Sequence, residues 1–153
     1  MIKIMFVCYG NICRSPMAEF LMKDYVEKLG ESAQFYIESS ATSYEEIGNP
    51  VHRGTRAILD GLGIDYSQKR SQKLTANHYD KFDYFIGMDE DNLFEMKRIL
   101  GGDPKNKVSL LLDYTSLKRD VADPYWTRNF EKTYSDIKLG VDALYKFLVA
   151  KNG

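Results

Sequence analysis

Cys8 and Arg14 lie near the start of the chain with five residues between them, and their side chains together could act on a phosphate ester. A cysteine thiolate is a strong nucleophile, and a guanidinium can hold two phosphate oxygens at once. The apolar run at residues 2–7 has the length of a short buried strand. Ser15 and Pro16 then predict a helix start, with the serine as N-cap and the proline at the first helical position. A loop that closes on a helix N-terminus directs backbone N–H groups and a positive dipole end towards a bound anion.

The loop between this strand and this helix contains residues that would shape an anion site. We expect Gly10 to let the backbone turn tightly, and Asn11 to hydrogen-bond the loop into place. A Ser15 hydroxyl near the sulfur of Cys8 would stabilise the thiolate as nucleophile or leaving group. The predicted phosphate-binding residues are Tyr9, Gly10, Asn11, Ile12, Cys13, Arg14 and Ser15.

The segment from Cys8 to Pro16 closely resembles the signature of the low-molecular-weight protein tyrosine phosphatases. That signature is Cys-x-Gly-Asn-Ile-Cys-Arg-Ser-Pro at the N-terminus, and only the variable position differs, being Tyr9 here. A cysteine and an arginine at this spacing are a weak pattern alone, since a cysteine at the end of a strand is commonly a small buried hydrophobe. The resemblance implies a phosphotyrosine-protein phosphatase that forms a phosphocysteine on Cys8.

A general acid is required as well, because the leaving oxygen must be protonated. Asp123 opens the run Asp-Pro-Tyr-Trp, whose aromatic residues could keep its carboxyl partly desolvated. An Asp-Pro pair alone is a common turn, but the family has its general acid in such a motif near the C-terminus. The resemblance therefore assigns to Asp123 the roles of acid and then base. Arg14 and the loop amides would compensate the phosphate charge, so we expect no metal and no other cofactor.

Aromatic side chains would select phosphotyrosine by contacting its ring. The candidates for this substrate wall are Tyr9, Tyr44, Tyr125 and Trp126. Ile12 also favours phosphotyrosine, because the branch of this fold that dephosphorylates arginine has threonine at the matching position. A protein arginine phosphatase remains an alternative, as does a phosphate binder without activity. An arsenate reductase of the same fold would need further cysteines after Cys13, and the chain has none.

The resemblance has two further consequences for this loop. The family counterpart of Cys13 can close a reversible disulfide with the nucleophile, so Cys8 and Cys13 are predicted to form a redox pair. The family often has a histidine, in the basic stretch before the third strand, that supports the loop. Residues 68–73 contain no histidine, and the loop-supporting candidates that remain are Asn11, Ser15 and Ser39. His52 and His78 lie in polar surroundings, and we expect both at the surface.

Composition narrows the class of protein. The chain has 153 residues, 44% hydrophobic and 28% charged, which is typical of a globular protein, and we expect residues 1–153 to form one domain. A net charge of −1 argues against nucleic-acid binding, and no apolar run approaches the ~20 residues that span a bilayer. No signal peptide is evident, so we expect a cytoplasmic protein with reduced thiols. By resemblance, its partners would be phosphotyrosine proteins, among them a bacterial tyrosine kinase, with phosphate or other oxyanions as product or inhibitor.

The remaining sequence predicts strands that alternate with helices. Strands are expected at residues 2–7, 34–39, 81–87 and 108–112, and helices at 16–30, 51–62, 90–100 and from 130 onwards, with a loop at 113–126. The expected inward residues of the first two helices are Ala18, Leu21, Met22, Tyr25, Leu29, Ala57, Ile58 and Leu62. This alternation indicates an open parallel α/β sheet. The resemblance implies a three-layer, flavodoxin-like sheet of four strands in the order 2-1-3-4, with helices on both faces.

Overall fold

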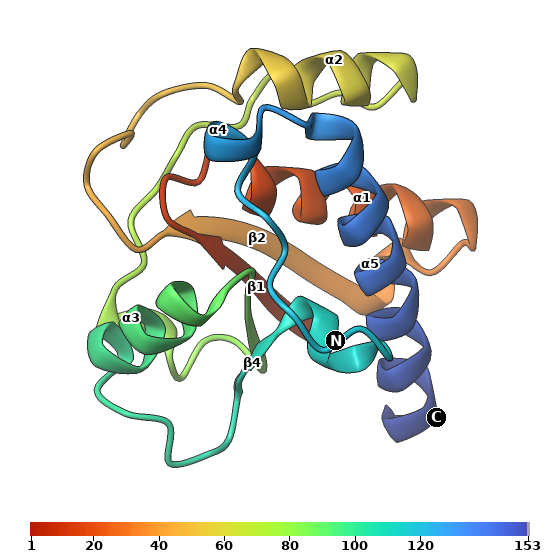
Figure 1. The fold of residues 1–153 in the computed structure, drawn as a ribbon. Helices are drawn as coiled ribbons and strands as arrows, with labels where there is room; N and C mark the ends of the chain where they lie inside the picture. The colour runs from red at the N-terminus through yellow and green to blue at the C-terminus, as the bar shows by residue number, and fades with distance from the viewer. Residues whose placement is uncertain (153) are drawn as a thin grey trace.

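Four parallel strands form the central sheet, in the order β2-β1-β3-β4, and helices cover both of its faces (Figure 1). This computed structural model describes residues 1–152. The strands are β1 Ile2–Cys8, β2 Phe35–Ala41, β3 Tyr84–Gly87 and β4 Val108–Leu110. The α-helices are α1 Arg14–Lys28, α2 Arg53–Gly61, α3 Glu90–Leu100, α4 Pro124–Thr127 and α5 Phe130–Asn152, and short 3-10 turns occupy Ser32–Gln34, Ala76–His78 and Leu111–Tyr114. The predicted α/β class and strand order are confirmed.

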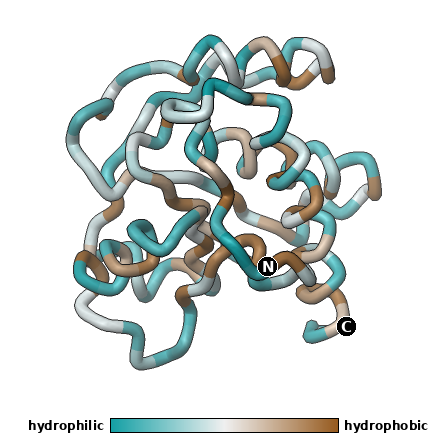
Figure 2. The backbone as a smooth tube through the Cα atoms, viewed as in Figure 1, coloured by the Kyte–Doolittle hydropathy of each residue, from teal (hydrophilic) through white to brown (hydrophobic). Residues whose placement is uncertain are grey.

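Strand β1 is central and buried on both faces, as its continuous apolar sequence predicts. Ile4, Phe6 and Cys8 face the core that α1 and α5 cover, whereas Met5 and Val7 face the core beside α3. Figure 2 shows hydrophobic residues concentrated in the sheet and on the inward sides of the helices. Cys8 therefore ends a strand that packing holds rigidly on both sides. Among residues 1–152, no helix combines the length and the hydropathy needed to cross a bilayer.

Helix α1 begins earlier than the sequence predicts. Its N-cap is Cys13, and Ser15 and Pro16 lie inside its first turn. Ser15 is not the N-cap because its hydroxyl is hydrogen-bonded to the side chains of Cys8 and Asn11 instead. The tertiary contacts of this hydroxyl thus override its usual capping preference.

The later elements also differ from the predicted bounds. Strand β3 begins only at Tyr84, since the Asp83 carboxylate accepts a hydrogen bond from the backbone N–H of Lys3 at 2.8 Å. Strand β4 ends at Leu110, whose N–H donates to the Asp113 carboxylate at 3.0 Å and so starts a 3-10 turn. The stretch 113–126 was expected to be a loop, but it contains the end of that turn and most of α4.

Two helix faces were predicted partly wrongly. Leu29 is 49% exposed because it is the C-cap of α1 and lies beyond its last packed turn. In α2, Ala57 and Leu62 are exposed, while Thr55 and Leu59 are buried. Helix α2 packs mainly against α1 and α5, so a narrow stripe of residues at a four-residue step is sufficient to pack it.

The two histidines are half-buried and not free surface residues. His52 is the N-cap of α2, where its Nδ1 accepts a hydrogen bond from the N–H of Gly54 at 3.0 Å. Its ring stacks on Phe130, with ring centres 5.3 Å apart. His78 caps a 3-10 turn by accepting from the N–H of Thr75 at 3.0 Å. Both histidines are therefore structural caps, a use that polar surroundings alone do not reveal.

Candidate active site

Residues 8–15 form a loop at the carboxyl end of β1, where ligands bind in open parallel sheets. The loops that follow β2 and α2 run past this loop and bridge to each other between Pro50 and Arg70 (Figure 1). Carbonyls of residues 8, 9, 10, 12 and 13 accept hydrogen bonds from these surroundings, namely from Thr42 N, Ser43 N, Ser71 Oγ, His52 N and Thr55 Oγ1. Because the carbonyls turn outwards, the N–H groups of the loop can converge on its centre.

The sulfur of Cys8 lies at this centre. The backbone N–H groups of Asn11 and Ser15 point at it, with N···S distances of 3.3 and 3.4 Å. The Ser15 Oγ is 3.0 Å from the same sulfur. Cys8 is only 3% exposed. These contacts are the ones that stabilise a thiolate.

The tight turn of the loop is at Asn11 and not at Gly10. Asn11 has a φ of 58°, in the left-handed region that asparagine tolerates better than most residues. At Gly10 an added Cβ would lie 3.3 Å from Cγ of Glu46. The prediction for Gly10 was therefore wrong in its reason, since close approach of a neighbouring side chain replaces conformational freedom.

Asn11 joins the three predicted loop-supporting residues into one network. Its Nδ2 donates to Ser15 Oγ at 2.7 Å and to Ser39 Oγ at 2.9 Å, and its Oδ1 accepts from the backbone N–H of Gln72 at 3.1 Å. Ser39 in turn donates to the buried carboxylate of Glu19 at 2.5 Å. The network therefore connects the sulfur-facing hydroxyl to α1, β2 and the segment before β3.

Arg14 is 2% exposed and is fastened by groups far away in the chain. Its Nη1 donates to the Asp89 carboxylate at 2.8 Å and to the Val121 carbonyl at 2.9 Å. Asp89 uses its other oxygen to cap α3, accepting from the N–H of Asn92 at 2.8 Å. Burial opposes the charge of Arg14, but Cys8 and Asp89 outweigh it and raise the pKa of Arg14 above its ordinary value. The guanidinium thus stays charged and fixed in direction.

Asp123 reaches the same site although 109 positions separate it from Arg14. Its Oδ2 lies 3.5 Å from Nη2 of Arg14, while its Oδ1 caps α4 by accepting from the N–H of Tyr125 at 3.0 Å. The Asp-Pro pair places Pro124 in the first turn of this short helix. A cysteine sulfur, a fixed cation and a partly exposed carboxyl therefore meet at one edge of the sheet.

The segment before Asp123 is tied to α5 by an ion pair between Arg119 and Asp136. Two hydrogen bonds of 2.9 and 3.0 Å join the guanidinium to this carboxylate, which is 3% exposed. Burial would raise the pKa of Asp136, but the Arg119 hydrogen bonds and the charges of Arg119 and Lys132 hold it below its ordinary value. This pair positions the chain that presents Asp123 to the site.

We expect Arg119→Met to lower the free energy of unfolding by about 1–2 kcal/mol at neutral pH, a modest loss because Arg119 is partly exposed. Since the carboxyl pKa is lower in the folded chain, the pair stabilises fully above about pH 5 and loses its effect as the pH falls below the unfolded value of about 3.9. Urea unfolding of both proteins at neutral pH and in acid measures this. An equal difference at both pH values would contradict the prediction.

The predicted substrate wall lies around this site but is widely exposed. Tyr9 is 47% exposed, and its hydroxyl donates to Glu45 at 2.7 Å. Tyr44 is 78% exposed, with the Lys73 ammonium 4.8 Å from its ring centre. Tyr125 and Trp126 extend from α4 and pack edge to face, with ring centres 4.9 Å apart. Each of these four side chains is at least 47% exposed and so leaves ring surface that a ligand can contact.

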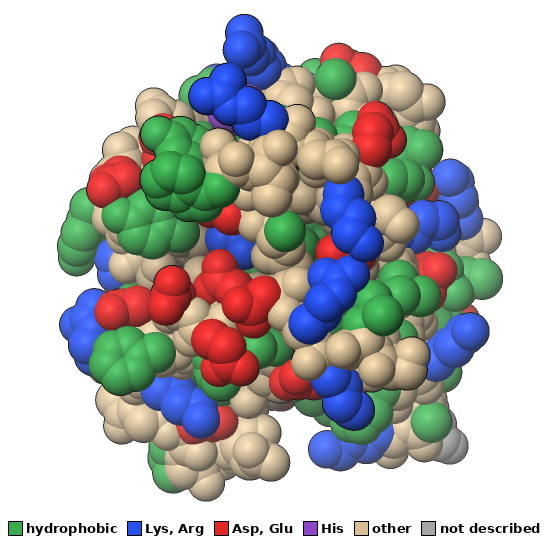
Figure 3. All heavy atoms as spheres, viewed as in Figure 1, with side chains coloured by type: hydrophobic (Ala, Val, Ile, Leu, Met, Phe, Trp, Pro, Cys, Tyr) green, Lys and Arg blue, Asp and Glu red, His purple; other side chains and the backbone are tan. Residues whose placement is uncertain are grey.

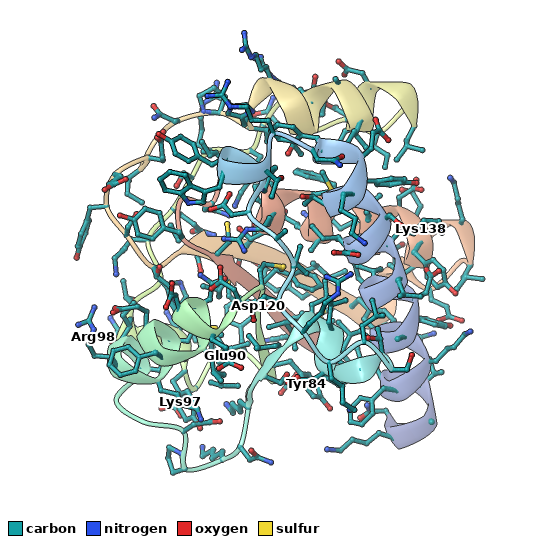
Figure 4. The ribbon with its side chains drawn as sticks, in the orientation of Figure 1. Tyr84, Glu90, Lys97, Arg98, Asp120 and Lys138 are labelled. Atoms are coloured by element: carbon teal, nitrogen blue, oxygen red, sulfur yellow. The ribbon has the colours of Figure 1, made fainter. Side chains whose placement is uncertain are left out.

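Acidic side chains gather in the middle of the face shown in Figure 3. Glu90 is the first residue of α3 and Asp120 lies beside it (Figure 4), where the Asp120 carboxylate accepts from the N–H of Glu90 at 3.2 Å. Burial and the neighbouring Asp89 and Asp91 raise the pKa of Asp120 above its ordinary value. An acidic rim, defined by Glu90, Asp91 and Asp120, therefore stands next to the carboxylate that holds Arg14.

Several supporting residues escaped the sequence analysis. Asp89 comes just before the helix predicted at 90–100, and nothing local indicates that it holds Arg14. Glu19 lies to one side of the apolar face predicted for its helix, so no local signal marked it, and only the structure shows that it is buried. Lys69 and Gln72 reach the network from a stretch with no periodicity. Within residues 1–152, no three His, Cys, Asp or Glu side chains are arranged to hold a metal ion.

Comparison with known proteins identifies the family. The family model of low molecular weight phosphotyrosine protein phosphatases matches residues 3–152. The low molecular weight protein-tyrosine-phosphatase YfkJ of Bacillus subtilis is 39% identical over 146 residues, which cover 94% of each chain. The YfkJ crystal structure superposes with a TM-score of 0.96 at 36% identity, covering 100% of this chain and 98% of that one. The Streptococcus pyogenes phosphatase SP-PTP superposes with a TM-score of 0.86 at 42% identity, covering 97% and 93%. The chain therefore belongs to the low molecular weight phosphotyrosine protein phosphatase family.

Proposed function

We propose that this protein hydrolyses phosphotyrosine in proteins through a phosphocysteine on Cys8. The observation that supports this most directly is the meeting of three groups at one sheet edge. The Cys8 sulfur faces two loop amides, Asp89 and the Val121 carbonyl hold the Arg14 guanidinium, and the Asp123 carboxyl lies 3.5 Å from that guanidinium. Family membership adds the reaction class.

In the first step the Cys8 thiolate attacks phosphorus and a sulfur–phosphorus bond forms. The bond from phosphorus to the tyrosine oxygen breaks, and Asp123 gives its proton to that oxygen. The loop amides and Arg14 stabilise the equatorial oxygens as charge builds on them. Ser15, 3.0 Å from the sulfur, lowers the energy of the thiolate before attack.

In the second step a water molecule attacks the phosphocysteine. Asp123, now ionised, takes a proton from the water, the sulfur–phosphorus bond breaks, and the thiolate and inorganic phosphate are released. The same groups therefore serve both steps, with Asp123 alternating between acid and base. Phosphate and similar oxyanions should bind the loop as product or competitive inhibitor, and no metal or other cofactor is required.

The depth of the Cys8 sulfur favours a phosphate that is attached to a long side chain. The sulfur is buried, so a phosphate on a long aromatic side chain reaches it better than one on serine. Tyr9, Tyr44, Tyr125 and Trp126 are proposed to contact that ring, and Ile12 in place of threonine disfavours phosphoarginine. A bacterial tyrosine kinase would be a natural phosphotyrosine partner.

The proposal is tested by phosphate release from phosphotyrosine, phosphoserine and phosphoarginine peptides of one sequence, in the presence of a chelator. We expect turnover of phosphotyrosine, with phosphoserine and phosphoarginine slower by at least about a hundredfold. Faster turnover of phosphoarginine would establish the arginine phosphatase instead. Binding without turnover of any peptide would favour a phosphate binder.

A cysteine nucleophile needs a reducing compartment, so the proposed location is the cytoplasm. Residues 1–153 are proposed to form one phosphatase domain, which the family match over residues 3–152 supports.

Cys13 is proposed to protect Cys8 from over-oxidation. Burial and the nearby Cys8 and Asp123 raise the pKa of Cys13 to about 12, so Cys13 stays a thiol while Cys8 reacts first. Peroxide converts the Cys8 thiolate to a sulfenic acid, and the Cys13 sulfur then displaces water from it to form a disulfide.

Mass spectrometry after mild peroxide should therefore find a Cys8–Cys13 disulfide that dithiothreitol reverses. Closure should accelerate as the pH rises, because burial keeps Cys13 mostly a thiol and its reactive thiolate fraction grows with pH. In the Cys13→Ser variant, Cys8 should proceed to sulfinic acid. Sulfinic acid on Cys8 of the unmodified chain, without any disulfide, would count against this role.

A further inference from the structure

His52 joins the start of helix α2 to the loop after β1. Its backbone N–H donates to the Ile12 carbonyl at 2.8 Å, and the buried Thr55 donates through its hydroxyl to the Cys13 carbonyl at 3.3 Å. A peptide unit is planar and trans, so a carbonyl that is held outwards turns the N–H of the next residue inwards. The start of α2 therefore directs the N–H groups of Cys13 and Arg14 towards the centre of the loop.

The side chain of His52 caps α2 only while its ring is neutral. Its Nδ1 accepts a hydrogen bond from the N–H of Gly54 at 3.0 Å, and a backbone N–H can only donate, so this Nδ1 has no hydrogen of its own. In the protonated ring both nitrogens are donors, and the cap is lost. The added positive charge would also lie at the positive end of the α2 dipole.

The charged groups around the ring oppose its protonation as well. They are Arg53 and Arg56 of α2 and Glu46 of the loop after β2. Burial, and then the two arginines, outweigh Glu46 and hold the pKa of His52 below its ordinary value. Helix α5 contributes the uncharged ring of Phe130, and the loop after β1 contributes an uncharged carbonyl. His52 is therefore neutral at neutral pH and takes up a proton only in acid.

Packing leaves the ring of His52 little room to turn away from Gly54. Phe130 stacks on the histidine with 14° between the ring planes, and the same phenyl ring leaves no space for a Cβ at Gly54. Repulsion between a protonated ring and the Gly54 N–H is therefore relieved by movement of the backbone at the start of α2. The hydrogen bonds from this segment to Ile12 and Cys13 weaken with that movement.

We propose that His52 is a pH switch for the loop after β1. With a neutral ring, α2 holds the two loop carbonyls and the loop binds an oxyanion; with a protonated ring, the start of α2 is released and the oxyanion is bound less tightly. This inference rests on the proposed function only in taking the loop as an oxyanion site, and it adds control of that site by acid. Since the pKa in the folded chain is below the ordinary value of about 6.5, the hold on the loop is complete above that pH and is lost as the pH falls through the folded value.

The first test is an NMR titration of the rings of His52 and His78 with pH, in sulfate and in chloride of equal ionic strength. Sulfate is the probe because it stays a dianion in this range, whereas phosphate changes its charge. Coupling between two sites is reciprocal, so an oxyanion that prefers the neutral ring must lower the pKa of His52. We expect this pKa to be about 0.7 lower in sulfate, which corresponds to about fivefold weaker sulfate binding by the protonated form.

Simple attraction between a dianion and a charged imidazole predicts the opposite sign. A pKa of His52 that rises in sulfate, or stays the same, would therefore overturn the proposal. His78 is the matched control in the same chain, because its Nδ1 also accepts from a backbone N–H at 3.0 Å but caps a turn before β3 and not α2. An equal fall for both histidines would indicate a general effect of salt, and the proposal would fail.

His52→Asn tests the switch with a side chain that does not titrate. Asparagine has an oxygen that can cap α2 and gains no proton in this range. From about pH 8 to about pH 5, sulfate binding should weaken about fivefold more in the unmodified protein than in His52→Asn, and His78→Asn should follow the unmodified protein. Equal weakening in the unmodified protein and His52→Asn, or no sulfate binding at the higher pH, would contradict the proposal.

These measurements need no turnover. An unmodified protein that binds sulfate with the expected pH dependence but does not hydrolyse phosphotyrosine would therefore refute the proposed function alone.

Discussion

Cys8→Ser is expected to reduce phosphotyrosine turnover by at least about 10⁴-fold, because a hydroxyl in this loop is not ionised and cannot replace a thiolate as nucleophile. The amides of Asn11 and Ser15 that face the sulfur stay in place, as does Arg14. Phosphate should therefore still bind the variant. Turnover and equilibrium phosphate binding are measured on the same preparation. Lost turnover with phosphate binding intact shows that the chemical step, and not the binding site, has been lost.

Cys13→Ser is the matched control for this change. It replaces the other cysteine of the same loop, and the Oγ of the new serine would occupy the half-buried position of the Cys13 sulfur. Its turnover under reducing conditions should stay within about tenfold of the unmodified protein, since Cys13 is no part of the proposed chemistry. If Cys8→Ser retained turnover similar to that of Cys13→Ser, the phosphocysteine mechanism would have to be abandoned.

Asp123→Asn is expected to slow phosphotyrosine hydrolysis by about 10²–10⁴-fold. An amide cannot deliver the proton that the tyrosine oxygen needs, but its oxygen can still accept from the N–H of Tyr125 and cap α4. The fold around the site should therefore persist. The first step should slow least for an aryl phosphate whose phenoxide leaves readily without a proton. Pre-steady-state rates of this step, measured for a series of aryl phosphates with phenoxides of increasing basicity, therefore show whether Asp123 donates the proton.

Asp120→Asn provides the comparison, because Asp120 is a carboxylate of the neighbouring rim and has no contact with Arg14 among the described hydrogen bonds. Its effect should not depend on the leaving group. A steeper dependence in Asp120→Asn than in Asp123→Asn would reassign the general acid to Asp120.

The contacts that support Arg14 and Asn11 join residues far apart in the chain, and this is why the sequence alone did not predict them. Arg14 and Asp89 are 75 positions apart, and Glu19 and Lys69 are 50 apart (69 − 19). No local pattern relates such residues. Arg14 and Asp89 meet because they follow β1 and β3, which are parallel neighbours in the sheet, and Glu19 and Lys69 meet because both contact Ser39 on β2. The same contacts explain the differences at the loop. The Ser15 hydroxyl lies at the Cys8 sulfur and does not cap α1, and the residue with the left-handed backbone is Asn11, whereas the tight turn was expected at Gly10.

The sequence by itself determined the α/β class, the place of the anion loop after the first strand, and the family. These depend on local properties: an apolar strand, a signature that surrounds Cys8, and an Asp-Pro pair that caps a helix. Only the tertiary structure decided which groups surround the reacting atoms and in which direction they hydrogen-bond. Packing determines these contacts, because the Gln72 N–H, the Glu19 carboxylate and the Lys69 ammonium come together only once the sheet has formed.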